Sequence, residues 1–189
     1  MKARRGPAGP PRELRLIGGS LRRSKLPVAD AQGLRPTPDR VRETLFNWLG
    51  QDLSGWRVLD AFAGSGALGF EAASRGAADV LLLERDPRLV ASLEASRQRL
   101  QVTTLRVERA DAMAWMARAA PARFDLVLLD PPFDAGLSAA ALAAALPLLR
   151  AGGSIYLEAA RPLEQLPDGL SERRRLQAGA VSAQWLTLN

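Results

Sequence analysis

Four acidic residues follow short apolar runs, and their side chains are the first candidates for chemistry. They are Asp60 in "RVLDAF", Glu84 in "DVLLLE", Asp111 in "LRVERAD" and Asp130 in "LVLLDPPF". Apolar runs of this length are typical of buried strands. An ionised carboxylate offers only hydrogen-bond acceptors, so acids at the ends of neighbouring strands suit a ligand that presents amino and hydroxyl groups.

A glycine-rich loop follows the first of these acids. Its residues are Phe62, Ala63, Gly64, Ser65 and Gly66, and Gly69 completes a G-x-G-x-x-G pattern. Glycines let a backbone approach a bulky cofactor closely. Dinucleotides use the same pattern, but Asp60 beside the loop would repel a pyrophosphate. It would instead attract the amino group of S-adenosylmethionine, which carries no phosphate.

We therefore predict S-adenosylmethionine as the cofactor, with Glu84 accepting hydrogen bonds from the two ribose hydroxyls. Asp111 is placed to accept from the adenine amino group, and the Ala112 amide is a nearby donor. Two alternatives stay open at this point. The glycines could form a ligand-free turn, and Asp111 could serve only as the N-cap of a helix.

The motif "DPPF" ends the fourth strand with Asp130, Pro131, Pro132 and Phe133. Prolines lack a backbone donor and fix φ near −65°, so they would hold neighbouring acceptors in a rigid arrangement. The family resemblance described below implies that the Asp130 side chain and the Pro131 carbonyl accept from an amine, and that Phe133 stacks on its ring. The alternative is a strand-ending turn with Phe133 in the core.

The composition excludes several kinds of chemistry. The chain has no cysteine and no histidine, which rules out disulfides, a Ser-His-Asp triad and the usual zinc ligands. We predict no metal site. The only lysines are Lys2 and Lys25, so the main body has no lysine for a Schiff base.

The acids must be positioned by alternating strands and helices. Strands are predicted at 57–62, 79–84, 105–109, 124–130 and 153–159, with helices at 66–77, 87–100, 111–120 and 137–149 between them. Such alternation predicts an α/β fold with a mostly parallel sheet and helices on both faces. Residues 173–188 predict one or two antiparallel strands that turn at Gly179. An earlier helix carries Val41 and Leu45 on one face, with Thr37 or Asp39 as its cap.

Positive charge is concentrated near the N-terminus. Residues 1–47 hold 11 of the 26 Lys and Arg but only four of the 20 Asp and Glu. This asymmetry favours contact with a polyanion, most plausibly nucleic acid. We interpret residues 1–11 as a disordered basic tail, 12–50 as a basic extension that contacts RNA, and 51–189 as the catalytic domain. The candidate RNA-binding residues are Arg15, Arg22, Arg23, Lys25, Arg35 and Arg40.

These motifs, in this order, resemble a known family. The chain resembles class I S-adenosylmethionine-dependent methyltransferases with a Rossmann-like fold, and "DPPF" resembles the motif of enzymes that methylate exocyclic amines of bases. More narrowly, "RLIGG", "GLRPTPDRVRETLFNWL", "FAGSGALGFEAASRGA", "LERD" and "DPPF" resemble the RsmD family. Those proteins are 16S rRNA (guanine-966-N2)-methyltransferases. The resemblance covers residues 15–136, and the tail more loosely.

The resemblance implies methylation of a guanine N2 in 16S rRNA, within an assembled or assembling small ribosomal subunit. It also places Thr37, Asp39, Arg40 and Asn47 at the edge of the pocket. Two stretches depart from the family pattern. Arg22-Arg23-Ser24 replaces an Arg-Gly-Arg run, and "AQWLTL" replaces a tyrosine-containing strand, so no functional residue is transferred to the tail.

Other functions remain open from the sequence. A DNA adenine-N6 methyltransferase shares the aspartate–proline–proline–aromatic motif, although the basic extension leaves little room for a separate target-recognition domain. A nicotinamide-dependent oxidoreductase could use the glycine loop, and a non-catalytic RNA-binding assembly module would need only the basic extension. We expect a cytoplasmic monomer, because no apolar run approaches the roughly 20 residues that span a bilayer and no signal peptide is evident.

Overall fold

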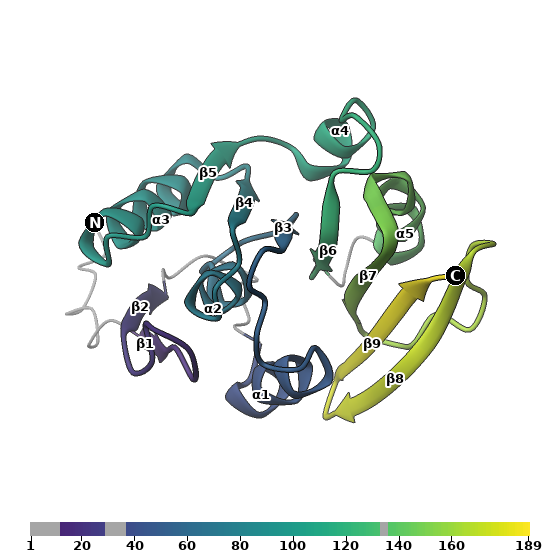
Figure 1. Ribbon diagram of the computed structural model, residues 1–189, viewed down its shortest axis with the longest axis horizontal. Helices are drawn as coiled ribbons and strands as arrows, with labels where there is room; N and C mark the ends of the chain where they lie inside the picture. Colours follow the sequence, from purple (N-terminus) through teal and green to yellow (C-terminus); the bar gives the residue numbers. More distant parts are fainter. Residues whose placement is uncertain (1–11, 29–36, 133–135) are drawn as a thin grey trace, which may run out of the picture.

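The computed structural model describes residues 12–28, 37–132 and 136–189, and a seven-stranded sheet forms its centre (Figure 1). In chain order these strands are β3 (Arg57–Asp60), β4 (Asp79–Glu84), β5 (Leu105–Arg109), β6 (Phe124–Leu129), β7 (Leu149–Ala159), β8 (Leu170–Ala178) and β9 (Val181–Leu188). Their order across the sheet is β5-β4-β3-β6-β7-β9-β8. The first five run parallel to one another, and β9 runs antiparallel to both β7 and β8.

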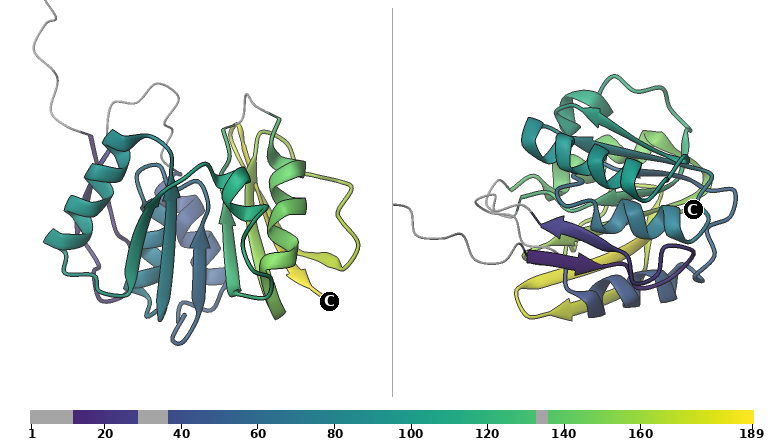
Figure 2. Two further views of the ribbon diagram at one scale, coloured as in Figure 1. Left: turned by 90° about the horizontal axis from the view of Figure 1, so that it is seen from above. Right: turned by 90° about the vertical axis from the view of Figure 1, so that its left-hand side faces the viewer.

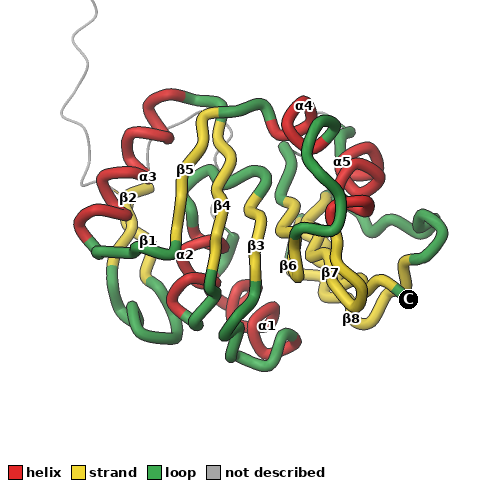
Figure 3. The backbone as a smooth tube through the Cα atoms, turned by 45° about the horizontal axis from the view of Figure 1, so that its top comes forward, coloured by secondary structure: helices red, strands yellow, loops and turns green. Residues whose placement is uncertain are grey.

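Helices cover both faces of this sheet (Figures 2 and 3). They are α1 (Asp39–Trp48), α2 (Ala67–Ser74), α3 (Pro87–Arg99), α4 (Ala112–Met116) and α5 (Ser138–Ala145). The helices α1, α2 and α3 contribute to one hydrophobic cluster, and α4 and α5 to the other. The direction of strand order reverses between β3 and β6, and ligands of doubly wound sheets bind at such a switch point.

Alternating strand residues divide the core between the two faces. Val58, Leu82, Leu126 and Leu128 belong to the cluster under α1 and α2, whereas Leu59, Leu81, Val127 and Leu129 belong to the cluster under α4 and α5. Successive side chains of a strand point to opposite faces. Both faces are buried, so these strands are apolar throughout, as parallel strands usually are.

The N-terminal segment forms a hairpin of β1 (Arg12–Arg15) and β2 (Lys25–Val28), outside the main sheet. It lies beside α2 in Figure 1. Leu14, Leu16 and Leu26 are buried in the α1–α2 cluster, and an Arg99 side chain donates to the Lys25 carbonyl at 2.5 Å. The hairpin therefore packs on the sheet domain through apolar side chains and leaves its charged ones outside.

The predicted fold class is confirmed, including the antiparallel C-terminal strands and their turn around Gly179. Several local predictions were wrong. The helix predicted at 111–120 is shorter, because α4 spans only Ala112–Met116 and a turn closed by a hydrogen bond from the Arg118 amide to the Trp115 carbonyl follows it. The helix predicted at 137–149 ends at Ala145, since Pro147 cannot donate to a helical carbonyl and a 3-10 turn follows at Leu146–Leu148. Neither Thr37 nor Asp39 caps α1, whose N-cap is Pro38. Among the described residues, no helix is long and apolar enough to cross a membrane.

Candidate active site

Three of the predicted acids lie at the carboxyl ends of adjacent strands. Asp60 is the last residue of β3 and pairs in register with Leu82 of β4 and Leu128 of β6. Glu84 ends β4, and Asp130 directly follows β6. The sheet thus brings together side chains that are up to 70 residues apart, at the switch point between β3 and β6.

Asp60 is almost completely buried, with 2% of its surface exposed. Its Oδ2 accepts a hydrogen bond from the Gly69 amide at 2.9 Å, in the first turn of α2. Burial raises the pKa of Asp60 to about 7, and the nearby Glu84 and Glu158 carboxylates add to this effect. A cationic amino group at this position would relieve the repulsion and favour the ionised form.

Glu84 fixes the start of the glycine loop. Its Oε2 accepts from the Gly64 amide at 3.0 Å, and its Oε1 accepts from the Asp86 amide at 2.8 Å. Each carboxylate oxygen has a second lone pair, so Glu84 retains acceptor capacity for two hydroxyl groups. The Gly64 amide is already bound to a carboxylate, and a phosphate at this place would meet negative charge.

The loop glycines have different roles. Gly64 and Gly66 have φ angles of 53° and 79°, in the region that favours glycine. A Cβ on Gly66 would lie 2.6 Å from Leu93, and one on Gly69 would lie 2.6 Å from Leu82. These two glycines permit close packing of α2, whereas Gly64 serves the contact with Glu84.

The other loop residues line the same turn. Ala63 is buried, and its amide donates to the Leu83 carbonyl at 3.0 Å, while Phe62 is half-buried against the α4–α5 cluster. Ser65 is half-buried. Backbone bonds thus hold the loop between the ends of β3 and β4.

Asp111 is the N-cap of α4, which confirms the alternative that the sequence left open for this residue. Its Oδ1 accepts from the Ala114 amide at 2.9 Å, and the side chain is exposed while Ala112 is buried. A cap uses one oxygen, so the proposed contact of Asp111 with an adenine remains a prediction.

Asp130 is partly buried among other acids. Burial raises its pKa well above the usual value, and the charges of Glu158 and Asp60 raise it further. Pro131 is buried and Pro132 is exposed, while Phe133 lies outside the described residues. The rigid prolines therefore follow a carboxyl group whose pKa is raised by burial and by two acidic neighbours.

Two residues of this site were missed from the sequence. Glu158 and Tyr156 lie on β7, are 1% and 0% exposed, and are joined by a hydrogen bond of 2.8 Å from the tyrosine hydroxyl. Glu158 closes the apolar run "SIYLE", so the signal that identified the other four acids also applied to this fifth strand.

In the described part of the chain, no group of three or more acidic side chains is arranged to hold a metal ion.

The predicted RNA-binding residues lie at the surface where the structure describes them. Arg15, Arg22, Arg23, Lys25 and Arg40 are exposed, and Arg35 lies outside the described residues. Lys25 forms an ion pair with Glu13 at 2.6 Å. Arg23 has a φ of 71°, at the position where the family pattern has glycine.

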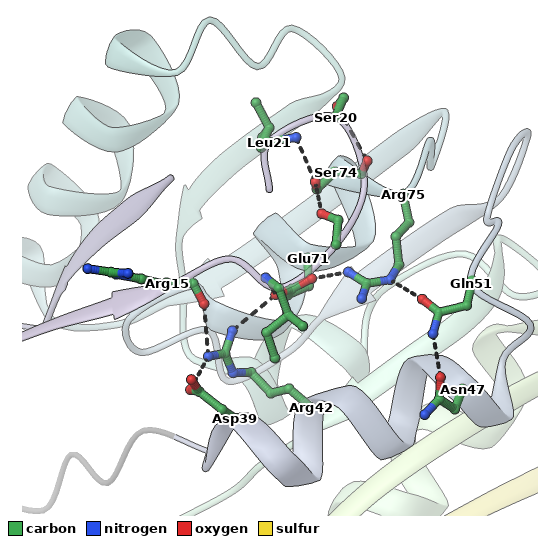
Figure 4. A network of polar contacts seen from close by, with 12 residues as sticks. Arg15, Ser20, Leu21, Asp39, Arg42, Asn47, Gln51, Glu71, Ser74 and Arg75 are labelled. Carbon is green, nitrogen blue, oxygen red and sulfur yellow. Dashed lines mark hydrogen bonds and ion pairs between the residues drawn. The ribbon is translucent and has the colours of Figure 1, made fainter. Parts of the chain in front are cut away.

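A buried ionic network ties the basic hairpin to α1 and α2 (Figure 4). Glu71 of α2 accepts from Arg42 of α1 at 3.1 Å, and also from Arg75 and from the backbone amide of Ile17. Arg42 in turn donates to the Arg15 carbonyl at 3.0 Å and to Asp39 at 2.6 Å. The hairpin, α1 and α2 are therefore held in one arrangement by charged side chains.

The hydrogen-bond acceptors around the glycine loop fit S-adenosylmethionine better than a dinucleotide. Two carboxyl groups at the ends of β3 and β4 flank the loop, and the Gly64 amide that would face a phosphate is occupied by Glu84. An amino group and a ribose match these acceptors.

Comparisons with known proteins place this arrangement in a family. A family model described as "Conserved hypothetical protein 95" matches residues 14–186. Ribosomal RNA small subunit methyltransferase D of Escherichia coli strain K12 is 47% identical over 125 residues, which are 66% of this chain and 63% of that protein. The matched part is thus slightly less than two thirds of the Escherichia coli relative.

Two further comparisons extend this match. The protein of the same name from Haemophilus influenzae is 44% identical over 133 residues, which are 69% of each chain. The solved structure of yhhF from Escherichia coli has a TM-score of 0.85 at 36% identity, and the alignment covers 93% of this chain and 98% of that one. The chain belongs to the family of the ribosomal RNA small subunit methyltransferase D proteins, the RsmD family.

Proposed function

We propose that this protein transfers a methyl group from S-adenosylmethionine to the exocyclic N2 amine of a guanine in 16S rRNA. The observation that carries the proposal is the row of carboxyl groups at the ends of β3, β4 and β6, the last of them followed by two rigid prolines. The names of the relatives support rRNA of the small subunit as the substrate class.

The residues around the glycine loop would hold the cofactor. Asp60 takes its amino group, Glu84 its ribose hydroxyls, and Asp111 with the Ala112 amide its adenine. Phe62, Ala63, Gly64, Ser65 and Gly66 form the wall of the site. When bound, S-adenosylmethionine supplies an electrophilic methyl group, so the protein needs no nucleophile of its own.

The residues after β6 would activate the substrate amine. The N2 of guanine is a poor nucleophile because its lone pair is delocalised into the ring. Hydrogen bonds from its N–H groups to the Asp130 carboxylate and the Pro131 carbonyl favour a pyramidal nitrogen and disperse the developing charge. Pro131 and Pro132 have no amide donor and little freedom, so these acceptors are oriented in advance.

The target base must leave its stack to reach this position. Phe133 would stack on the extruded base, and the basic extension of residues 12–50 would position the RNA through its phosphates. Within it, Arg15, Arg22, Arg23, Lys25, Arg35 and Arg40 are the proposed contacts. We place the protein in the cytoplasm as a monomer that acts on an assembled or assembling small subunit.

The Asp130→Ala variant tests the proposal. It should lose methyl transfer by at least about 100-fold, the range for one preorganised group, and should keep the wild-type affinity for S-adenosylmethionine in calorimetry. The exposed Asp168→Ala variant, far along the chain in the loop before β8, is the matched control and should retain full turnover.

Mass mapping of the methylated nucleotides identifies the product. The proposal expects N2-methylguanine in 16S rRNA from small-subunit particles incubated with the protein. Methylation of adenine N6 in DNA instead would contradict the proposal and favour the alternative function, a DNA adenine-N6 methyltransferase. Wild-type turnover by Asp130→Ala would remove Asp130 from the mechanism.

A further inference from the structure

The pair formed by Tyr156 and Glu158 is a buried feature that the proposed function does not use. The Tyr156 hydroxyl donates to Glu158 Oε1 at 2.8 Å, and neither side chain has more than 1% of its surface exposed. A carboxylate that is buried to this extent is expensive to maintain without partners. The position of this pair on β7, beside β6 and the candidate active site, points to a role there.

The strand register places Glu158 beside Asp130. Leu129 at the end of β6 pairs with Leu157 of β7 in a parallel arrangement, so the residues that follow them in the chain, Asp130 and Glu158, lie side by side in the next row. Because side chains alternate, both point to the face that also carries Asp60 and Tyr156. Three acids from three neighbouring strands thus share the face covered by α1 and α2.

The charged groups around this cluster act unequally on its members. Hydrogen bonds from Tyr156 and Thr37 and the positive charge of Arg42 on α1 lower the pKa of Glu158 and oppose the larger effect of burial, which raises it. For Asp130, the neighbours in the described part of the chain act the other way, because Glu158 on β7 and Asp60 on β3 both raise its pKa. Glu84 of β4 acts on Asp60 in the same direction. Among the described residues, three groups thus oppose the effect of burial on the pKa of Glu158, whereas both acidic neighbours of Asp130 add to it.

We propose that Glu158 is a positioning residue for methyl transfer, held by Tyr156 and by Thr37 before α1, and that it controls when Asp130 is able to accept hydrogen bonds from the substrate amine. The proposal rests on the proposed function for the role of Asp130. A protonated carboxyl group is a weaker acceptor than a carboxylate. The negative charge of Glu158 therefore disfavours ionisation of Asp130. Asp130 becomes a full acceptor only when the N–H donors of the substrate or a cation lie beside it.

The experiment compares Glu158→Gln with the wild-type full-length protein. Glutamine has the same shape and can still accept from Tyr156, but it removes the negative charge. The side-chain carboxyl of Asp130, followed by NMR in protein labelled with 13C-aspartate, should titrate at a lower pH in this variant. Glu43→Gln makes the same change on the exposed surface of α1 and should leave the Asp130 titration unchanged.

The pH profile of kcat gives the second measurement. Methyl transfer should rise with pH as Asp130 ionises, and the acid limb of this profile should move to lower pH in Glu158→Gln. A purely structural role for Glu158 would lower kcat or thermal stability without moving the limb. Unchanged Asp130 titration and an unchanged acid limb would overturn the proposal.

Tyr156→Phe provides an independent variant if Glu158→Gln does not fold. Without the hydroxyl donor, Glu158 is neutralised more easily, so Asp130 loses its repulsion and its titration should move in the same direction by a smaller amount. A shift in the opposite direction would contradict the proposal. The NMR result needs no turnover, so a shifted titration with no methyl transfer by wild-type protein would refute the proposed function alone.

Discussion

The buried Asp60 carboxyl group makes the stability of the ligand-free protein depend on pH. Its pKa in the folded protein is about 7, compared with an ordinary value of 3.8. The folded state therefore holds its proton more strongly than the unfolded state. The protonated Asp60 therefore contributes fully to the free energy of unfolding below its ordinary pKa. This contribution is lost as the pH rises through the folded-state pKa of about 7.

Asp60→Asn should accordingly stabilise the ligand-free protein at high pH. The shift of about three units corresponds to up to about 4 kcal/mol in the free energy of unfolding at about pH 8, and to almost nothing near pH 4. The asparagine oxygen can still accept from the Gly69 amide. Urea unfolding at both pH values measures the difference, and an equal effect at both would contradict the assignment of the proton to Asp60.

At the scale of single elements, the sequence predicts order and type well and long-range polar contacts poorly. The strand-end acids Asp60, Glu84 and Asp130 were identified because apolar runs and short connections define a parallel sheet. The role of Thr37 could not be predicted from the sequence, because its hydroxyl forms a hydrogen bond with Glu158, which is 121 residues away. The same holds for Arg42. In the sequence it is one of many basic residues of the N-terminal segment, yet its side chain is fully buried against Glu71.

The ionic network of α1 and α2 yields a prediction at this scale. Arg42→Met leaves the Glu71 carboxylate without one partner and frees the Arg15 carbonyl. Breaking a buried pair costs roughly 3–5 kcal/mol, and we expect about 3 kcal/mol because Arg75 still neutralises Glu71. Urea unfolding measures this loss.

Arg40→Met is the matched control, since Arg40 lies on the same helix and is exposed. It should change the free energy of unfolding by no more than about 0.5 kcal/mol. Equal effects of the two substitutions would show that Arg42 stabilises α1 by helix propensity and not through the network.

At the scale of the whole molecule, the basic hairpin and the acidic strand ends form separate regions. The hairpin carries Arg22 and Arg23 on the turn that joins β1 and β2, and both side chains are exposed. The acids of the candidate active site lie at the carboxyl ends of the parallel strands. RNA affinity and methyl transfer should therefore respond to different substitutions.

The double variant Arg22→Ala and Arg23→Gly tests this separation. If each arginine contacts a phosphate, the slope of log affinity against log salt concentration for a 16S rRNA fragment should become less steep by about 2. Glycine suits the φ of 71° at position 23, so the variant should not lose stability, and it should raise KM with little change in kcat. The exposed Arg118→Ala, at the end of α4, removes a cation on the opposite face and should leave the slope unchanged. A slope as steep as that of the wild-type protein would place the RNA elsewhere on the surface.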